Sequence, residues 1–344
     1  MEQIQTYRIL WQKRTDGGAR LLRIYGTSPQ VFIPSEIAGH PCVEIAPYCF
    51  APKTHLLREA YQEEIISVEE ISSGYPFMCG KIHNNRESDE LYLQELCKNA
   101  IEEVVLPDTV EEIGSCAFYD CRKLKRLHMG SAVHTIGSDA FMNTLSLQEI
   151  FLRSREGEKS GIQRVLSQIS SSIEVSFINS GKTDAILLYP EYYESYDEIA
   201  PAHLFGRSIT GEGFRARQCF KEGKVDFGGY DAIFLQACVE ESENTLFKMA
   251  LNRLQYPYGL ADGQKEIYQD YLRAHIDRCA SSLVRQKNLQ TLKFLCREKL
   301  LYGEVLAACI REAAETEWTE GAADLLQLAA SGKEEKKNRY DFDF

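Results

Sequence analysis

Cysteines and histidines are the residues of this sequence most readily used for metal binding or nucleophilic chemistry. The chain has 11 cysteines among 344 residues, but Cys42, Cys49, Cys116 and Cys121 lack the paired Cys-x-x-Cys spacing of a zinc site. No histidine stands at a matching ligand spacing either. We therefore interpret these cysteines as reduced thiols, several of which serve as small apolar residues of the core. The sequence predicts no metal site, no cofactor and no catalytic residue.

A second group of reactive residues lies between positions 181 and 265. Cys219 and His203 would form a nucleophilic pair only if the fold brought them together. Gly211-Glu212-Gly213 lacks the third glycine and the Lys-Ser/Thr of a phosphate-binding loop, so it favours a turn. One basic cluster is interleaved with aromatic residues, and it would bind an acidic partner or phosphate, or pair with acidic residues of this chain. The cluster consists of Arg207, Arg215, Arg217, Lys221 and Lys224, with Phe214 and Phe220.

The elements that would position such residues follow a 23-residue repeat, in which Ile113-Gly114 and Ala117-Phe118 return as Ile136-Gly137 and Ala140-Phe141. A fixed period in this range is typical of a solenoid, whose coils bury their apolar sides against one another. Each coil opens with the spacing Leu-x-x-Leu-x-Leu, which predicts one short strand per coil. The predicted strands are 31–33, 104–106, 127–129, 149–152 and 173–176, and the phenylalanines predicted to stack inside are Phe50, Phe118 and Phe141.

The run VVLPDTVEEIGSCAFYDCRKLKRL at 104–127 resembles the leucine-rich repeat of the BspA-like bacterial surface antigens. Strand, proline, Ile-Gly, Ala-Phe and cysteine occur in the order that this repeat requires, and residues 30–50 carry the same pattern. The resemblance implies a leucine-rich repeat solenoid with a parallel sheet. Many members of that family are secreted, whereas these cysteines favour a reducing compartment, so surface adhesion is not carried over to this chain.

The fold class predicted for the whole chain is α+β, with the solenoid followed by an all-α helical-repeat domain. A second, 33-residue period relates Leu292 and Leu295 to Leu325 and Leu328. This is the ankyrin spacing, so the region is similar to ankyrin-type helix pairs, although the Thr-Pro-Leu-His signature is absent. The predicted segments are an N-terminal hairpin cap at 1–27, a solenoid at 28–180 with an insertion at 51–99, an irregular connector at 181–230, a helical domain at 231–332 and a disordered tail at 333–344.

Charge and hydropathy narrow the classes of partner and compartment. The formal net charge is −12 at pH 7, which argues against nucleic-acid binding because phosphates would be repelled. No apolar run reaches the length of a signal sequence or membrane helix, so we expect no membrane association. The expected location is the cytoplasm.

The residue between the two inward positions of each strand faces outward, and these residues should form a column across the sheet: Phe32, Val105, His128, Phe151 and Glu174. An exposed apolar column marks an interaction surface, unless the insertion or the C-terminal helices cover it. The favoured function is therefore a non-catalytic scaffold or adaptor that binds an unknown protein through this sheet face. The alternative is an enzyme with a site in the 181–265 region. The predicted protein-binding residues are Phe32, Val105, Lys125, Arg126, His128, Gln148 and Phe151.

Overall fold

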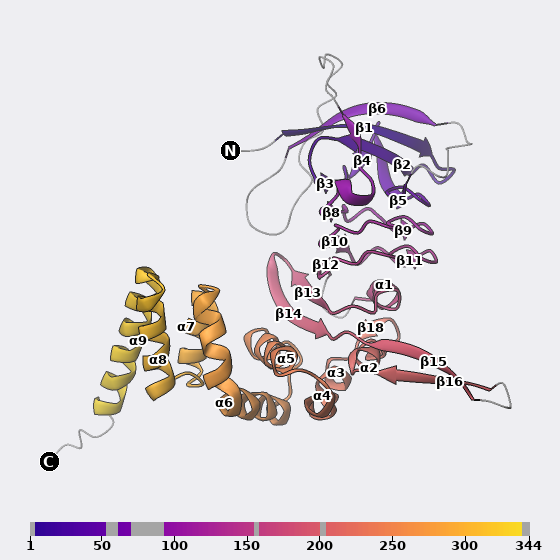
Figure 1. Cartoon of the computed structure of the whole chain (residues 1–344). Coiled ribbons are helices and arrows are strands. Elements are labelled where there is room, and N and C mark those ends of the chain that lie inside the picture. Colours follow the sequence, from indigo (N-terminus) through magenta and orange to yellow (C-terminus); the bar gives the residue numbers. More distant parts are fainter. Residues whose placement is uncertain (1–3, 53–60, 70–92, 155–157, 200–203, 339–344) are drawn as a thin grey trace. The chain divides into compact units, whose positions relative to one another are not determined.

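The computed structural model describes residues 4–52, 61–69, 93–154, 158–199 and 204–338 of the chain. These residues form two compact units, 1–241 and 242–344 (Figure 1). The first unit is a β-solenoid with a parallel sheet and the second is helical, which confirms the predicted α+β class.

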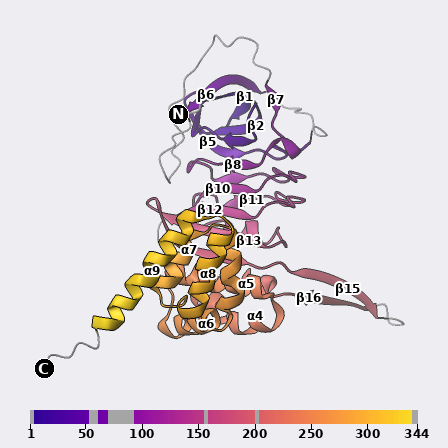
Figure 2. The same cartoon turned by 60° about the vertical axis from the view of Figure 1, so that its left-hand side comes forward.

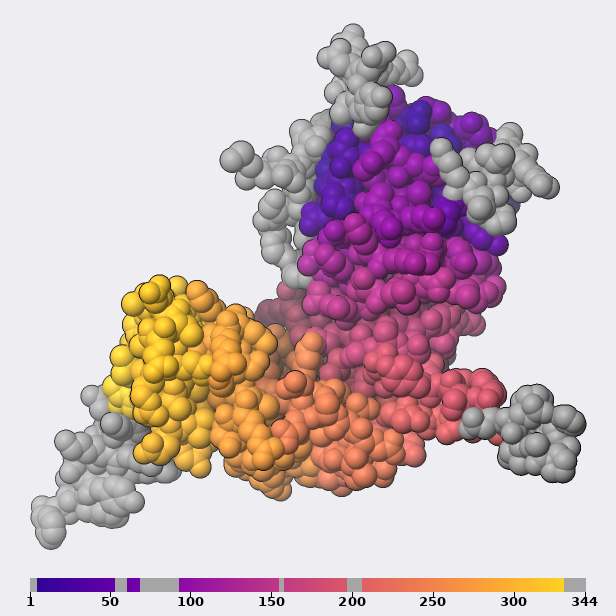
Figure 3. All heavy atoms as spheres, in the orientation of Figure 1, coloured from indigo at the N-terminus to yellow at the C-terminus, as the bar shows by residue number. Residues whose placement is uncertain are grey.

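The principal sheet of the solenoid contains one strand from each successive coil. Its parallel strands are β3 (Gln30–Phe32), β8 (Glu103–Val105), β10 (Arg126–Gly130), β12 (Glu149–Arg153) and β13 (Ile173–Asn179). All five overlap the predicted strands. The antiparallel strand β14 (Lys182–Tyr189) ends the sheet after β13. Successive coils lie directly against one another in the space-filling view (Figure 3).

A second sheet forms the other side of the coils and joins them to the N-terminal hairpin. The predicted hairpin is confirmed, because β1 (Ile4–Lys13) and β2 (Ala19–Gly26) pair antiparallel across the Asp16-Gly17-Gly18 turn. The remaining strands of this sheet are β4 (Glu36–Ile37), β5 (His40–Ile45), β6 (Gln62–Glu69), β7 (Gln94–Glu95), β9 (Glu112–Ile113) and β11 (Thr135–Ile136). Strand β6 belongs to the stretch predicted as an insertion, and it pairs along its whole length with β1. A short 3-10 helix, η1 (Lys98–Ala100), leads into β8.

Three stacked phenylalanines form the centre of the solenoid, as predicted. The ring of Phe118 lies 4.9 Å from that of Phe50 and 5.2 Å from that of Phe141, with interplanar angles of 8° and 11°. All three side chains are at most 1% exposed. The amide of Phe118 donates to the carbonyl of Ala140 at 2.8 Å, so backbone hydrogen bonds hold adjacent coils at the spacing that the rings require.

Gly137 shows why a glycine follows both Ile113 and Ile136 in the repeat. A Cβ atom at this position would lie 2.3 Å from the backbone nitrogen of Ser115 in the preceding coil. The sequence suggests that glycine serves a tight bend, but the structure shows that it permits two backbones to approach closely.

The segment 181–230 contains strands and helices, so its prediction as an irregular connector is wrong. Besides β14 it contains β15 (Tyr193–Ile199), β16 (Leu204–Thr210), α2 (Gly213–Ala216), β17 (Phe220–Lys221), β18 (Lys224–Val225) and part of α3 (Phe227–Ala232). Helix α1 (Ile162–Leu166) lies earlier, in the last coil. Helices α3 and α4 (Phe234–Glu240) belong to the first unit, although the sequence analysis assigns them mainly to the helical domain.

Arg217 fastens this segment to the end of the solenoid. Its guanidinium is 3% exposed and donates to the carbonyls of Ile169 at 2.9 Å, Ser171 at 2.7 Å and Pro190 at 2.6 Å. Burial lowers the pKa of Arg217 to about 10, so the side chain remains charged at neutral pH. Buried carbonyl groups thus find their hydrogen-bond donors in one cation.

The second unit consists of helices throughout its described length (Figure 2). They are α5 (Glu243–Gln255), α6 (Asp262–Arg285), α7 (Leu289–Arg297), α8 (Gly303–Glu315) and α9 (Thr319–Asn338). Helix α6 packs on α7 and α8, and α9 packs on α7 and α8. Helix α9 continues into the stretch predicted as a disordered tail, and residues 339–344 lie outside the described part. None of the helices in the described ranges has both the length and the apolar character needed to span a membrane.

The helix pairs repeat at a different interval from the one read in the sequence. Helix α7 begins at Leu289 and α9 at Thr319, and 319 − 289 gives an interval of 30. Buried Cys279 and Leu295 correspond in this register to buried Cys309 and Leu325. The predicted interval of 33 residues exceeds the observed interval of 30 by nearly one helical turn. It therefore keeps apolar residues on the same helix face but matches each residue with the wrong equivalent in the next helix pair. The ankyrin likeness is therefore not confirmed.

Candidate protein-binding face of the solenoid sheet

The predicted outward column exists in the register of the principal sheet, with one correction. Phe32 pairs with Val105, Val105 with His128, and His128 with Phe151. The next member is Ser176, because Phe151 pairs with Ser176 while Glu174 pairs with Glu149.

The correction arises from the last coil. Ile150 pairs with Val175, and 175 − 150 gives a spacing of 25 instead of 23. Two additional residues leave the alternation of the strand intact, so inward residues stay inward. Glu174 is consequently outward, as predicted, but lies beside Glu149 and Arg126 in a neighbouring row.

Exposure divides this column into two parts. Phe32 is 6% exposed, Val105 5% and His128 2%, so these three predicted contact residues are buried. Their burial contradicts the expectation that these three side chains are exposed. Phe151 and Ser176 are partly exposed.

The predicted polar residues beside the column are accessible. Lys125 and Gln148 are exposed, and the side chain of Arg126 is 41% exposed. Together with the partly exposed members of the neighbouring rows they define an accessible area, which we call the β10–β13 face. It consists of Lys125, Arg126, Gln148, Glu149, Phe151, Glu174 and Ser176.

A buried carboxylate organises the polar side chains at the edge of this face. Glu103 accepts hydrogen bonds from Arg126 Nη2 at 2.6 Å and from His128 Nε2 at 2.7 Å. Burial acts to raise the pKa of Glu103, but the hydrogen bonds from His128 and Arg126 outweigh it and hold the pKa below its ordinary value. The imidazole of His128 stacks on Phe151, with 4.4 Å between the ring centroids. Glu103 therefore fixes His128, and His128 supports the aromatic ring that is accessible.

Charged side chains of the β10–β13 face have two kinds of neighbour: some lie beside an opposite charge and others beside a like charge. Lys125 Nζ lies 2.9 Å from Glu102, so the first basic residue has an acidic neighbour. Glu149 and Glu174 stand directly opposite each other on adjacent strands, a like-charged pair that is unfavourable by itself.

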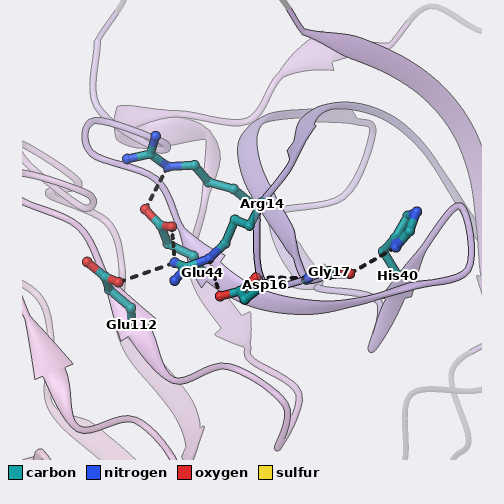
Figure 4. Close-up of polar contacts among 8 residues, drawn as sticks. Arg14, Asp16, Gly17, His40, Glu44 and Glu112 are labelled. Carbon is teal, nitrogen blue, oxygen red and sulfur yellow. Dashed lines mark hydrogen bonds and ion pairs between the residues drawn. The ribbon is translucent and has the colours of Figure 1, made fainter.

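A separate ionic cluster lies on the other sheet, where it fastens the hairpin to the coils (Figure 4). Arg14 donates to Glu44, which is 5% exposed, and Arg20 forms an ion pair with the same carboxylate at 2.6 Å. Arg14 also reaches Glu112 in the next coil at 3.4 Å. This cluster is not predictable from the sequence, since only the strand register brings Arg20, Glu44 and Glu112 into one row. Its role is to hold the cap, because every charge in it has an opposite neighbour.

Polar residues of the 181–265 region, where the alternative places an enzyme site, take part in local structural contacts. Arg215 pairs with Glu212 at 2.9 Å, and Asp226 pairs with Lys221 at 2.7 Å while accepting from the Gly229 amide. Burial raises the pKa of Cys219 to about 11, which keeps the thiol protonated at neutral pH. His203 lies outside the described residues.

Most of the basic cluster is likewise occupied within the chain. Arg207 lies 2.6 Å from Glu194, and Arg217 is bound to carbonyl groups. Intramolecular pairing, one of the two alternatives for the cluster, thus holds for Arg207, Arg215 and Lys221. Within the residues that the structure describes, no three side chains of His, Cys, Asp or Glu gather as ligands for a metal ion.

Comparison with known proteins agrees with the repeat architecture. Residues 92–183 match the family described as BspA type leucine-rich repeat region, in six copies. A leucine-rich cell surface protein from Faecalibacterium prausnitzii is a structural match at 18% sequence identity, with a TM-score of 0.26 over 52% of this chain and 42% of that protein. The chain thus spans less than half the length of that relative. No curated protein matches the sequence.

Proposed function

We propose that this protein is a non-catalytic scaffold or adaptor that binds a protein partner through the β10–β13 face. Repeats of the matched type suggest a protein-interaction role, and such repeats are typically without catalytic activity. The observation that carries the proposal is the position of Phe151. It lies partly exposed on a parallel sheet, stacked on His128 and opposite the partly exposed Ser176 of β13. An aromatic residue with polar neighbours on a pre-organised surface is the usual composition of a binding hot spot.

The cysteines support a reducing compartment, and we place the protein in the cytoplasm on that basis. The ten cysteines within the described ranges are all free. Burial raises the pKa of Cys49 and Cys121 well above that of an ordinary thiol, so these side chains serve as apolar core residues. The net charge of −12 favours a protein partner over nucleic acid.

Affinity capture with matched variants tests the proposal. Phe151→Asp removes the accessible ring, Lys125→Glu reverses an exposed charge on the same face, and Tyr302→Asp alters an exposed aromatic residue (64%) of the second unit as the control. We expect a partner that is lost with Phe151→Asp, weakened with Lys125→Glu and retained with Tyr302→Asp. Circular dichroism establishes that each variant is folded. Retention of every partner by folded Phe151→Asp and Lys125→Glu variants would refute binding at this face.

A further inference from the structure

The strands β15 and β16 form a ribbon that is separate from both sheets of the solenoid. Among the described strands they pair only with each other, in register from Tyr193–Thr210 to Ile199–Leu204. Figures 1 and 2 show this ribbon extending away from the other strands of the first unit. Its base is anchored, because Tyr192 donates its amide to the Ser170 carbonyl at 3.0 Å and contacts the Phe214 ring edge-on.

Neither face of this ribbon is buried near its base. Tyr193 is 64% exposed and Tyr196 63%, and these two residues lie on opposite faces because side chains alternate along a strand. Ser195, Ser208 and Thr210 are exposed as well. A two-stranded ribbon with no buried face is marginally stable by itself, so a third strand would contribute both hydrogen bonds and cover.

The two edges of the ribbon differ in charge. Residues 191–198 contain Glu191, Glu194, Asp197 and Glu198 and no basic residue. The opposing strand β16 contains Arg207 and no acidic residue. The outer edge of β15 is therefore an acidic strand edge that repels acidic chains and nucleic acid and attracts basic ones.

The tyrosines add a specific contribution to this edge. The hydroxyl of Tyr196 donates to Glu194 at 3.3 Å, and a side-chain hydrogen bond to Glu191 raises the pKa of Tyr193. Each face of β15 thus presents a tyrosine hydrogen-bonded to a carboxylate. Glu194 also pairs with Arg207 of β16 at 2.6 Å, so a lysine or arginine of an added strand would share that carboxylate with Arg207 on one face and would find Glu191 beside Tyr193 on the other.

From these observations we infer that the outer edge of β15 binds an extended, basic segment of a partner protein by β-strand addition. The segment adds a third strand beside β15, with its backbone paired to the edge and its basic side chains against the tyrosine–glutamate pairs. This surface is distinct from the β10–β13 face, so the inference does not rest on the function proposed above.

Binding of defined peptides to the full chain tests this inference. The probe is the fluorescein-labelled peptide Lys-Thr-Val-Arg-Val-Lys-Thr, followed by fluorescence anisotropy. Saturable binding that weakens with added salt is expected, with increased amide protection over 193–196 in hydrogen exchange. The same peptide N-methylated at alternate residues keeps its charge but loses the amide donors of one edge. One of the two alternating N-methylated versions is expected to bind like the parent, because its methyl groups point away from β15, and the other is expected to lose binding. If both versions bind as well as the parent, strand addition is overturned.

Variants separate this edge from the general acidity of the chain. Glu191→Gln combined with Glu194→Gln is expected to weaken peptide binding about tenfold. Glu304→Gln with Glu320→Gln removes the same charge from exposed positions of the second unit and should leave binding unchanged. Equal weakening by both pairs of substitutions would overturn the assignment to β15. Peptide binding without amide protection at 193–196 in the unsubstituted protein would overturn it as well, and that result does not depend on the folding of any variant.

Discussion

Replacement of Phe118 by alanine should destabilise the first unit more than most single substitutions do. Phe118 is 0% exposed and lies between two rings, those of Phe50 and Phe141. Truncation of a buried phenylalanine costs about 3–5 kcal/mol, from lost apolar burial and the cavity that remains. Because Phe118 loses ring contacts on both sides, each of about 0.5–1.5 kcal/mol, we expect the upper end of that range, about 4–5 kcal/mol. Phe118→Leu, which fills most of the volume, should cost about 1–3 kcal/mol, mainly the two ring contacts.

The distribution of tryptophans makes this measurable for the first unit alone. Of the two tryptophans in the chain, Trp11 is buried in the first unit and Trp318 in the second. In a Trp318→Phe background the fluorescence therefore reports on the first unit during urea unfolding. With a slope of about 1–3 kcal/mol per molar urea, a loss of about 4 kcal/mol lowers the midpoint by more than about 1 M.

Leu145→Ala provides the control, because Leu145 is 71% exposed and its truncation should change the free energy of unfolding by less than about 0.5 kcal/mol. If Phe118→Ala shifted the midpoint no further than Leu145→Ala, the stacked column would not be the core of the solenoid.

Three further predictions concern other contacts. Gly137→Ala should lower the free energy of unfolding by more than about 2 kcal/mol in chemical unfolding, because its Cβ would meet the Ser115 backbone. Gly263→Ala should stabilise its helix slightly, because nothing lies within 4 Å of a Cβ at this position. The pKa of Glu103 is lowered in the folded state, so its contribution to stability is present above the unfolded pKa and is lost as the pH falls through the folded pKa. Glu103→Gln should therefore reduce the fall of the melting temperature at acid pH. An unchanged pH dependence of the melting temperature would contradict the pairing. Arg217→Met should cost at least about 2 kcal/mol in the same unfolding assay, because buried carbonyl groups lose their donor, and a neutral substitution would show that water replaces it.

Local periodicity predicts the parts of the fold that depend on stacking identical coils. The strands β8, β10 and β12 and the stacking of Phe118 on Phe141 follow directly from the 23-residue spacing, because each coil repeats the contacts of its neighbour. The strands β3 and β13 and the position of Phe50 follow from the same residue pattern at other spacings. The hairpin is equally local, since its turn residues lie between its strands.

Features that depend on pairing between distant segments could not be predicted in this way. The partner of Phe151 is Ser176 because the last coil has two additional residues. An insertion of two residues leaves the inward and outward alternation of the strand unchanged, so the sequence pattern does not reveal it. The helix pairs repeat every 30 residues, whereas the sequence pattern predicts 33. The two intervals are hard to distinguish because a three-residue shift on a helix keeps apolar residues on one face. Burial of Phe32, Val105 and His128 also lay beyond the sequence, since strand alternation states which face a residue occupies but not whether that face is covered.

Hydrogen exchange on the complex tests most directly whether the β10–β13 face binds the partner. The partner identified by affinity capture is purified and added to the full chain, and amide protection is compared between the free and bound states. The proposal predicts increased protection in peptides spanning Lys125–Gly130 and Gln148–Arg153, and loss of that protection with Phe151→Asp. Protection confined to other parts of the chain, with these peptides unchanged, would contradict it.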